Sequence, residues 1–281
     1  NDVALITFVP FTFIVLDLAG AEARKQLLVP VVTLQTVAAN LGSMLTPIGN
    51  PQNLYLYGKA GLSLSSFVLL MLPYTLVSFL LVMLWSAVQT RKYDAPIAVS
   101  FSEHVRLADK KIQLAVYLLL FAADLLTVAR VIPYGLALLI TAVGILLADR
   151  SIFARLDYSL LLTFVGFFVF IGNMGRLPVF HDFLQRIVSG SELLTGAAAS
   201  QVINNVPAAL LLSGFTDDLA PLIIGVNIGG LGTLIASMAS LISYKLVVRE
   251  EGAVKGAYFR CFTWTNLAFL AVLMLFAFAL R

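Results

Sequence analysis

The sequence predicts an all-α, polytopic membrane protein made of two inverted repeats, each with a re-entrant hairpin and a discontinuous transmembrane helix. Of its 281 residues, 12% are charged and 60% are apolar, so polar side chains are too few to cover a water-soluble protein. Long stretches without charged residues recur along the chain, as membrane spans require. Two of these stretches also share an internal repeat of asparagine, glycine and threonine.

The same composition excludes several other classes of protein. A soluble enzyme and a disordered chain do not fit, and a single cysteine, Cys261, cannot form an internal disulfide. The net charge of +3 is too small to indicate nucleic-acid binding. The two histidines, His104 and His181, lie outside the apolar stretches, which argues against a buried histidine site for a metal or for catalysis. We therefore expect no enzymatic activity and no cofactor other than a sodium ion or proton as coupling ion.

The first repeat is expected to occupy residues 1–90. Its elements are a hairpin arm that is free of charge over 3–16, a broken helix at 27–58 and a helix at 64–90. The broken helix cannot be continuous, because glycine, proline and asparagine gather between Asn40 and Asn53. Non-helical backbone at membrane depth is tolerated only where it is buried in protein or lines a wet cavity, so this break marks a candidate site.

A polar cytoplasmic connector is expected at 91–111, and the second repeat at 112–281. The second repeat should contain, in order, helices at 112–129, 131–148 and 158–175, a re-entrant hairpin at 187–216, a broken helix at 219–244 and a helix at 257–280. The hairpin is predicted because its stretch is too long for one crossing and too short for two. Its middle is polar at Ser200-Gln201 and at Asn204-Asn205.

Charge distribution predicts the orientation of these elements. If the spans alternate in direction, 13 of the 18 lysines and arginines fall on one side and 5 on the other. The positive-inside rule makes the first side cytoplasmic, so we expect a multi-pass protein of the cell (inner) membrane with the lipid bilayer as a partner. Trp85, Trp264, Tyr93 and Tyr258 are expected near the cytoplasmic ends of spans, as members of an aromatic belt.

The internal repeat relates the two broken helices. Two stretches that begin at Asn40-Leu41-Gly42 and at Asn227-Ile228-Gly229 match at a constant offset of 187 residues, so that Thr46 corresponds to Thr233. Four spans lie between the copies, so the second copy should be inverted relative to the first. Inverted repeats with discontinuous helices that meet at mid-membrane are typical of secondary transporters.

An asparagine-rich hairpin tip precedes each copy. The tips read Asn1-Asp2-Val3 and Asn204-Asn205-Val206, and the structural alternative for the second tip is a simple turn or cap. By comparison with the second half, about 92 residues of the first half should precede Asn1, so the chain should begin at the tip of the first hairpin.

The chemistry of a broken helix suits ion binding. The amide end of the second half attracts an anion and the carbonyl end of the first half attracts a cation, while glycine lets backbone approach a ligand. Glycine also serves close helix packing. The candidate substrate- and ion-binding residues are Asn1, Asp2, Asn40, Gly42, Thr46, Pro47, Gly49, Asn50, Asn53, Asn204, Asn205, Asn227, Gly229, Thr233 and Ser237. Sodium sites are expected in the Asn1/Asn50 and Asn205/Thr233 regions. The carboxylate of Asp2 has three alternative roles, which are binding the coupling cation, carrying a proton and capping the following helix.

The motifs NLGSMLTPIGNPQN at 40–53, NIGGLGTLIAS at 227–237 and INNVP at 203–207 resemble the ion transporter superfamily. This superfamily contains sodium/dicarboxylate symporters, citrate and arsenite permeases and NhaD-type antiporters, and the resemblance covers essentially the whole chain. It implies that Thr46, Pro47, Gly49, Asn50 and Asn53 contact cation and substrate. It also implies a homodimer, and a mobile transport domain that carries substrate past a scaffold. The tips lack the Ser-Asn-Thr signature of dicarboxylate relatives, which favours the citrate- or arsenite-like branch.

Together these features predict a secondary active transporter of a small anion, namely a carboxylate or oxyanion such as citrate or arsenite. Transport is expected to be coupled to a sodium or proton gradient and to proceed by alternating access. The alternatives are a sodium/proton antiporter of the same superfamily, with Asp2 as the exchanging carboxylate, and a channel.

Overall fold

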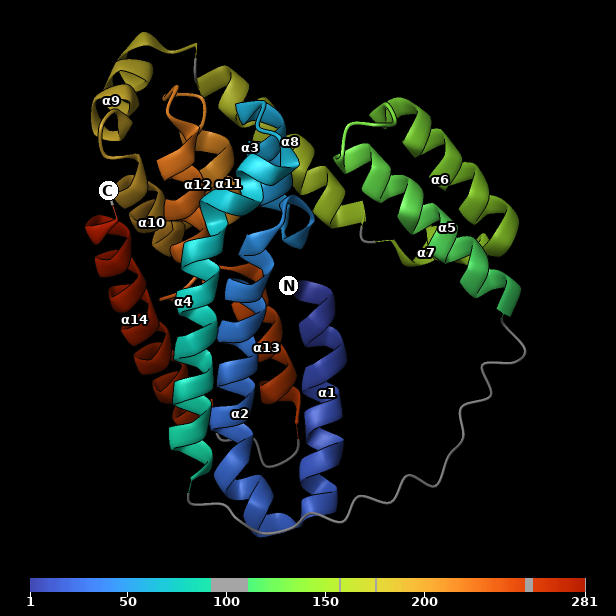
Figure 1. Ribbon diagram of the computed structural model, residues 1–281, viewed down its shortest axis with the longest axis vertical. Helices are drawn as coiled ribbons and strands as arrows, with labels where there is room; N and C mark the ends of the chain where they lie inside the picture. Colours follow the sequence, from blue (N-terminus) through green and yellow to red (C-terminus); the bar gives the residue numbers. More distant parts are fainter. Residues whose placement is uncertain (92–110, 157, 175, 251–254, 281) are drawn as a thin grey trace. The chain divides into compact units, whose positions relative to one another are not determined.

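The structure is a computed structural model that describes residues 1–91, 111–156, 158–174, 176–250 and 255–280 (Figure 1). Over these residues the chain forms α-helices and short 3-10 turns and no strand. Five of the described helices are long and apolar enough to cross a membrane. The prediction of an all-α polytopic membrane protein is therefore confirmed. Most of the expected connector at 91–111, including Tyr93 and His104, lies outside the described residues.

The chain divides into two compact units, one formed by residues 1–99 and 169–281 and the other by residues 100–168. In the second unit, α5 (Lys111–Val128) packs against α6 (Tyr134–Asp149), which leads into the short α7 (Ser151–Arg155). The contact includes a hydrogen bond of 3.0 Å from the hydroxyl of Thr141 to Asp124. The helix α8 (Tyr158–Met174) begins in this unit and ends in the first.

The first repeat lies wholly in the larger unit. It consists of α1 (Asp2–Ala19), α2 (Ala21–Gly42), two 3-10 turns (Ser43–Leu45 and Pro47–Gly49), α3 (Pro51–Ala60) and α4 (Leu64–Thr90). The helix breaks after Gly42, and Pro47 and Pro51 then begin the second 3-10 turn and α3, where a missing N–H costs nothing. Asn50 caps α3, because its side-chain oxygen accepts a hydrogen bond from the backbone nitrogen of Asn53 at 2.9 Å.

The second repeat contributes a hairpin and a second broken helix to the same unit. Its elements there are α9 (Pro178–Val188), α10 (Glu192–Ile203), α11 (Asn205–Leu212), α12 (Leu219–Ile228), α13 (Met238–Arg249) and α14 (Lys255–Ala279). Between α10 and α11 the chain turns at Asn204, whose φ of 73° is a conformation that asparagine adopts more readily than most residues. The break between α12 and α13 ends at Ser237, which caps α13 through a bond of 3.1 Å from the nitrogen of Ser240.

The helices of the two halves make equivalent contacts, each with its own half and with the opposite half. In the first half, α1 packs against α2 and α13, and in the second half α11 packs against α12 and α3. The two broken helices lie side by side and run in opposite directions, since α2 contacts α13 and α12 contacts α3 (Figure 1). The predicted inverted repeat is therefore present in the fold, and it brings the two helix breaks together.

A buried apolar core supports this arrangement. It joins α1, α2, α13 and α14 through residues that include Val9, Val32, Ala239 and Phe262, each completely shielded from solvent. Tyr258 belongs to the same core and is also fully buried, so the expectation that it lies in an aromatic belt is wrong. The start of α14, where Tyr258 lies, packs against α13, and the sequence around Tyr258 does not predict this contact. Trp264, in contrast, is 74% exposed.

Candidate functional site

The polar side chains of the two helix breaks bond across to each other. Asn227, at the end of α12, accepts a hydrogen bond from Nδ2 of Asn50 at 3.1 Å and donates one to Oδ1 of Asn53 at 2.6 Å. Asn40, at the end of α2, donates to Oγ of Ser237 at 3.0 Å. Asn40 corresponds to Asn227 in the repeat, and Asn50 corresponds to Ser237. The same kind of contact is therefore made twice. In each case the residue at the end of the helix before one break bonds to the residue that caps the helix after the other break.

This cluster of polar side chains is buried and carries no formal charge. Its members have side chains that are at most 5% exposed, and they are Asn40, Asn50, Asn53, Asn205, Asn227 and Ser237. Amide and hydroxyl groups offer both donors and acceptors, so they bind one another without a buried ion. No group of three or more histidines, cysteines or acidic residues is arranged for a metal within the described part of the chain. The cluster itself offers a cation neutral oxygens.

The first break is closed in the sense that its backbone carbonyl groups are hydrogen-bonded. Their partner is Asn53, which belongs to α3, the half-helix that follows the break. Nδ2 of Asn53 lies 3.2 Å from the carbonyl oxygens of Met44 and Thr46 and 3.4 Å from that of Ser43. An amide group has two hydrogens, so two of these carbonyls are satisfied at a time. Gly49 permits the tight path of the chain, because a Cβ there would lie 1.8 Å from the carbonyl oxygen of Ser43. Gly42 has no atom within 4 Å of such a Cβ.

The second break is closed by Gln201 of the hairpin arm α10. Its Nε2 donates to the carbonyl oxygens of Gly229 at 2.8 Å and Leu231 at 2.9 Å, and its Oε1 accepts from the backbone nitrogen of Thr233 at 2.9 Å. Gln201 is not among the predicted site residues. Its signal in the sequence is the polar pair Ser200-Gln201 in the middle of the predicted hairpin. Gly229 packs closely on that arm, since a Cβ there would lie 2.7 Å from the Cα of Ala197.

The start of α1 and the tip of the α10–α11 hairpin are each held to a break by one hydrogen bond. The terminal amino group of Asn1 donates to the carbonyl oxygen of Gly49, and the backbone nitrogen of Asn205 donates to that of Ala236, both at 2.9 Å. Gly49 and Ala236 correspond in the repeat, so Asn1 and Asn205 occupy equivalent positions in the structure. The sequence match had instead aligned Asn1 with Asn204, one residue earlier. The predicted Asn1/Asn50 region is thus brought together by the structure. Asn205 instead lies beside Ala236, whereas Thr233 is exposed and bonded to Gln201.

The remaining predicted residues lie around this buried cluster. Pro47 is buried within the first break, whereas Thr46 is half-buried. Asn204 is also half-buried, and its side chain donates to the carbonyl oxygen of Ile235 at 3.1 Å. Asp2 is half-buried at the start of α1, and its Oδ1 is buried without a hydrogen-bond partner in the described structure. The partly exposed groups would meet a ligand first, with the buried amides behind them.

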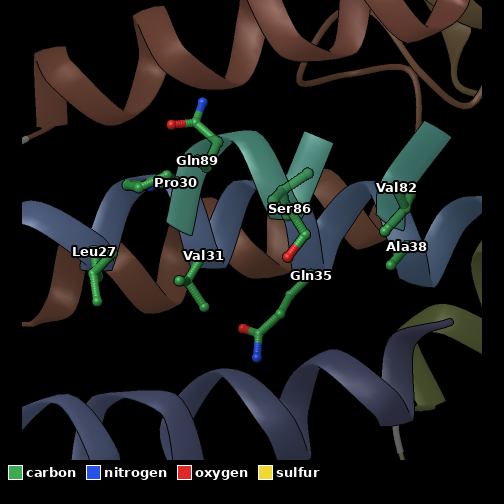
Figure 2. Close-up of a pocket in the computed structure, with 9 residues that line it drawn as sticks. Leu27, Pro30, Val31, Gln35, Ala38, Val82, Ser86 and Gln89 are labelled. Atoms are coloured by element: carbon green, nitrogen blue, oxygen red, sulfur yellow. The ribbon is translucent and has the colours of Figure 1, made fainter. Parts of the chain in front are cut away.

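A pocket of about 220 Å³ extends between α2 and α4, among the side chains labelled in Figure 2. A second pocket of about 110 Å³ shares Ala38 and Val82 with it and reaches Gly42 at the first break. The walls are mostly apolar. However, four polar side chains of the apolar helix α4 lie on one face of it and line one pocket or the other. They are Thr75, Ser78, Ser86 and Gln89. None of the residues that line these two pockets, apart from Gly42, is among the predicted site residues.

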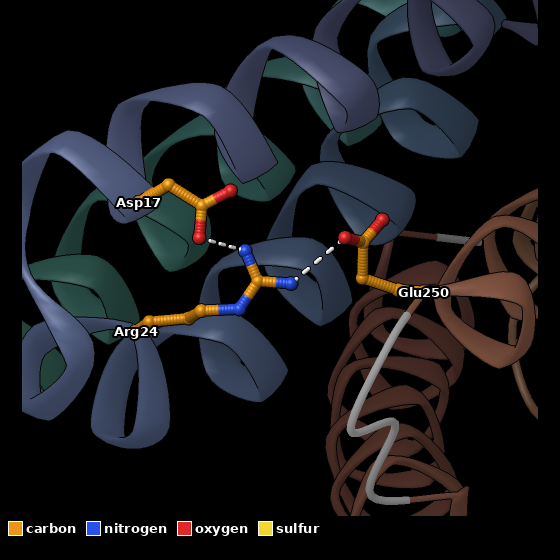
Figure 3. A network of polar contacts seen from close by, with 3 residues as sticks. All are labelled: Asp17, Arg24 and Glu250. Atoms are coloured by element: carbon orange, nitrogen blue, oxygen red, sulfur yellow. Dashed lines mark hydrogen bonds and ion pairs between the residues drawn. The ribbon is translucent and has the colours of Figure 1, made fainter.

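Ionic and polar contacts tie the base of each hairpin to the opposite broken helix. Arg24 pairs with Asp17 at the end of α1 and lies 2.9 Å from Glu250, just after α13 (Figure 3). On the other hairpin, Nζ of Lys59 in α3 donates to the carbonyl oxygen of Ser213, just after α11, at 2.5 Å. These contacts are equivalent in position, although their chemistry differs.

Comparison with known proteins agrees with the resemblance seen in the motifs. Residues 1–221 match the family model described as citrate transporter. An uncharacterized transporter of Methanocaldococcus jannaschii is 33% identical over 246 residues, which cover 88% of this chain and 66% of the relative. Inner membrane protein YbiR of Escherichia coli is 31% identical over 251 residues, covering 88% and 64%. The chain thus spans slightly less than two thirds of the length of these relatives. It belongs to the citrate transporter family of multi-pass membrane proteins.

Proposed function

We propose that this membrane transporter is a secondary active transporter of a small anion, a carboxylate or an oxyanion such as citrate or arsenite. It couples transport to a sodium or proton gradient. The observation that carries the proposal is the reciprocal bonding of Asn40 to Ser237 and of Asn50 to Asn227, which joins two helix breaks in an uncharged, buried cluster. Discontinuous helices that meet in this way are the sites where secondary transporters bind substrate and coupling ion.

The arrangement suits an anion together with a cation. The second half-helices α3 and α13 begin at Asn50 and Ser237, and a helix N-terminus favours negative charge. The first halves end in carbonyl groups, which favour a cation. Because an isolated charge is costly at membrane depth, binding both ions together lowers the cost of each.

Alternating access is part of the proposal. The single backbone bond from Asn205 to Ala236 is a small barrier to opening the tip of the α10–α11 hairpin. The start of α1, the second hairpin tip and both breaks lie in the unit formed by residues 1–99 and 169–281, which would be the mobile transport domain that the resemblance implies. Residues 100–168 would belong to the scaffold, and the homodimer implied by the resemblance belongs to the same proposal.

A sodium/proton antiporter is the second candidate, and Asp2 favours it. One carboxylate oxygen of Asp2 is buried at the tip of the first hairpin without a hydrogen-bond partner in the described structure. An ionisable group in such a position is typical of ion pathways and proton relays.

Transport in proteoliposomes tests both candidates. The full-length protein should accumulate labelled citrate or arsenite when a sodium or proton gradient is imposed, with saturable kinetics that distinguish it from a channel. Asn50→Ala and Asn205→Ala should abolish uptake without changing membrane insertion. Asn173→Ala is the matched control, because Asn173 is exposed and bonds only to its own helix, at the carbonyl oxygen of Val169. Absence of anion uptake under either gradient would refute the proposal, and sodium-driven proton flux without anion would support the antiporter.

A further inference from the structure

We propose that four buried hydroxyl groups between α2, α13 and α14 bind a sodium ion, at a position separate from the helix breaks. The residues are Thr33, Thr36, Ser243 and Tyr258, called here the hydroxyl cluster. The inference rests on the proposed function only in that a coupling cation is expected. None of the four is among the predicted site residues, and each is at most 1% exposed.

The oxygens of this cluster lie close together. Oγ1 of Thr36 on α2 is 2.7 Å from Oγ of Ser243 on α13, and the hydroxyl of Tyr258 on α14 lies beside both. Thr33 precedes Thr36 by three residues on α2, so the two side chains share one face of the helix. Three helices thus contribute oxygen atoms to one buried place.

Two of these hydroxyls bond to each other, since Oγ1 of Thr36 lies within donating distance of Oγ of Ser243 at 2.7 Å. Thr36 reaches the carbonyl oxygen of Val32 at 2.8 Å, and Ser243 reaches that of Ala239 at 3.1 Å. A hydroxyl has one hydrogen and two lone pairs, so the oxygens of Thr36 and Ser243 keep lone pairs that can bind a cation. The oxygens of Thr33 and Tyr258 are buried and have no hydrogen-bond partner in the described structure. Buried oxygens without partners are destabilising, and a cation would satisfy them.

The other half of the fold shows that packing does not require these hydroxyls. At the offset of 187 residues, Thr33 corresponds to Ala220, Thr36 to Ile223 and Ser243 to Leu56. Tyr258 corresponds to Phe67, because Tyr244 contacts Tyr258 as its counterpart Tyr57 contacts Phe67, with ring centroids 6.3 Å and 5.9 Å apart. All four counterparts are apolar. The same helix junction is therefore built once with hydroxyls and once without them.

Sodium fits this chemistry better than an anion. The cluster presents oxygen ligands, which hard cations prefer, and it presents no ammonium or guanidinium group. A bound ion would also act on the second break. Ser240, one turn from Ser243, is 2.9 Å from Ser237, which in turn accepts the bond from Asn40. Occupancy would thus hold α2 against α13 beside the proposed substrate site.

The test measures sodium binding by the full-length purified protein. Thermal unfolding is followed in increasing NaCl, with choline chloride keeping the ionic strength constant. Sodium should stabilise the wild-type protein with a saturable dependence. Thr36→Val, Ser243→Ala and Tyr258→Phe should each weaken the apparent sodium affinity at least tenfold, and Thr36→Ser should retain it. Ser78→Ala is the matched control, because Ser78 is a buried hydroxyl that bonds only to its own helix, at the carbonyl oxygen of Tyr74.

Two results would overturn the inference. One is a wild-type protein that sodium does not stabilise, as expected if a water molecule occupies the cluster. The other is unchanged sodium affinity in a Thr36→Val/Tyr258→Phe double variant, a change that the apolar counterparts Ile223 and Phe67 show the fold can accept. Anion uptake is measured separately on the same preparations. Uptake with no effect of the cluster variants on sodium affinity would refute the sodium site alone, whereas absence of uptake would refute the proposed function.

Discussion

The cross-break contacts predict an unequal effect of two equivalent substitutions. Asn40 and Asn227 occupy corresponding positions in the repeat, yet their partners differ. Asn227→Ala removes the hydrogen bonds to Asn50 and Asn53 together. Asn40→Ala removes the bond to Ser237 and a weaker one of 3.4 Å to the carbonyl oxygen of Gly230. We expect Asn227→Ala to be the more destabilising change.

The magnitude follows from what each substitution leaves behind. After Asn227→Ala, Nδ2 of Asn50 still reaches Ser43 at 3.2 Å, but Oδ1 of Asn53 loses the one donor found for it in the described structure. Two lost hydrogen bonds cost about 1 kcal/mol each, and a buried acceptor without a partner adds about 1–3 kcal/mol. The expected loss is about 3–5 kcal/mol. After Asn40→Ala, Ser237 keeps its contact with Ser240, so the loss should be about 1 kcal/mol.

Unfolding of the full-length variants in one detergent, with Asn173→Ala as the control, measures this difference. A double-mutant cycle sharpens it. The penalty at Asn53 exists only while its side chain is present, so Asn53→Ala should cost about 1–3 kcal/mol less in the Asn227→Ala background than in the wild type. Equal destabilisation by Asn40→Ala and Asn227→Ala, or additive effects in the cycle, would show that the bonding across the breaks is not as described.

Four further substitutions test other parts of the site. Gly49→Ala should prevent correct closure of the first break and abolish transport, because the added Cβ would meet the carbonyl oxygen of Ser43 at 1.8 Å. Gly42→Ala, with no atom within 4 Å, should leave stability within about 1 kcal/mol of wild type, and equal expression of both folded variants would contradict this reasoning. Gln201→Met keeps the side-chain length but loses the hydrogen bonds to the second break, so stability should fall by about 1–3 kcal/mol in the same assay and transport should weaken. Arg24→Gln should cost about 1 kcal/mol at low salt and less in high salt, and a loss that does not depend on salt would exclude the ion pairs as its cause.

The sequence predicts the elements of the site because their causes are local. Proline at 47 and 51 prevents a continuous helix, and Asn50 is a strong capping residue in the right place to restart it. The repeat offset predicts which residues correspond. It does not predict that Asn40 touches Ser237, because two polar groups 197 positions apart are joined only when the helices pack in opposite directions.

The residues that the sequence analysis missed depend on tertiary contacts without a local signal. Gln201 has no counterpart in the matched stretches, so the repeat could not identify it. Tyr258 lies near the end of an apolar helix, where aromatic residues are usually anchors, and α13 buries it. Gly229 had two interpretations from sequence, and its close approach to Ala197 shows that packing is at least one of its roles.

The backbone carbonyl groups of the two breaks are bonded by different parts of the chain, and this difference matters if the hairpins open as proposed. The carbonyls of the first break are bonded by Asn53, which belongs to α3 and so lies outside the hairpin arms. Those of the second break are bonded by Gln201, which belongs to the hairpin arm α10. Moving α10 away from α12 would therefore release the carbonyls of Gly229 and Leu231, whereas moving α1 would leave the first break closed. Because free carbonyl groups attract a cation, ion binding at the second break should depend on hairpin position far more strongly than at the first.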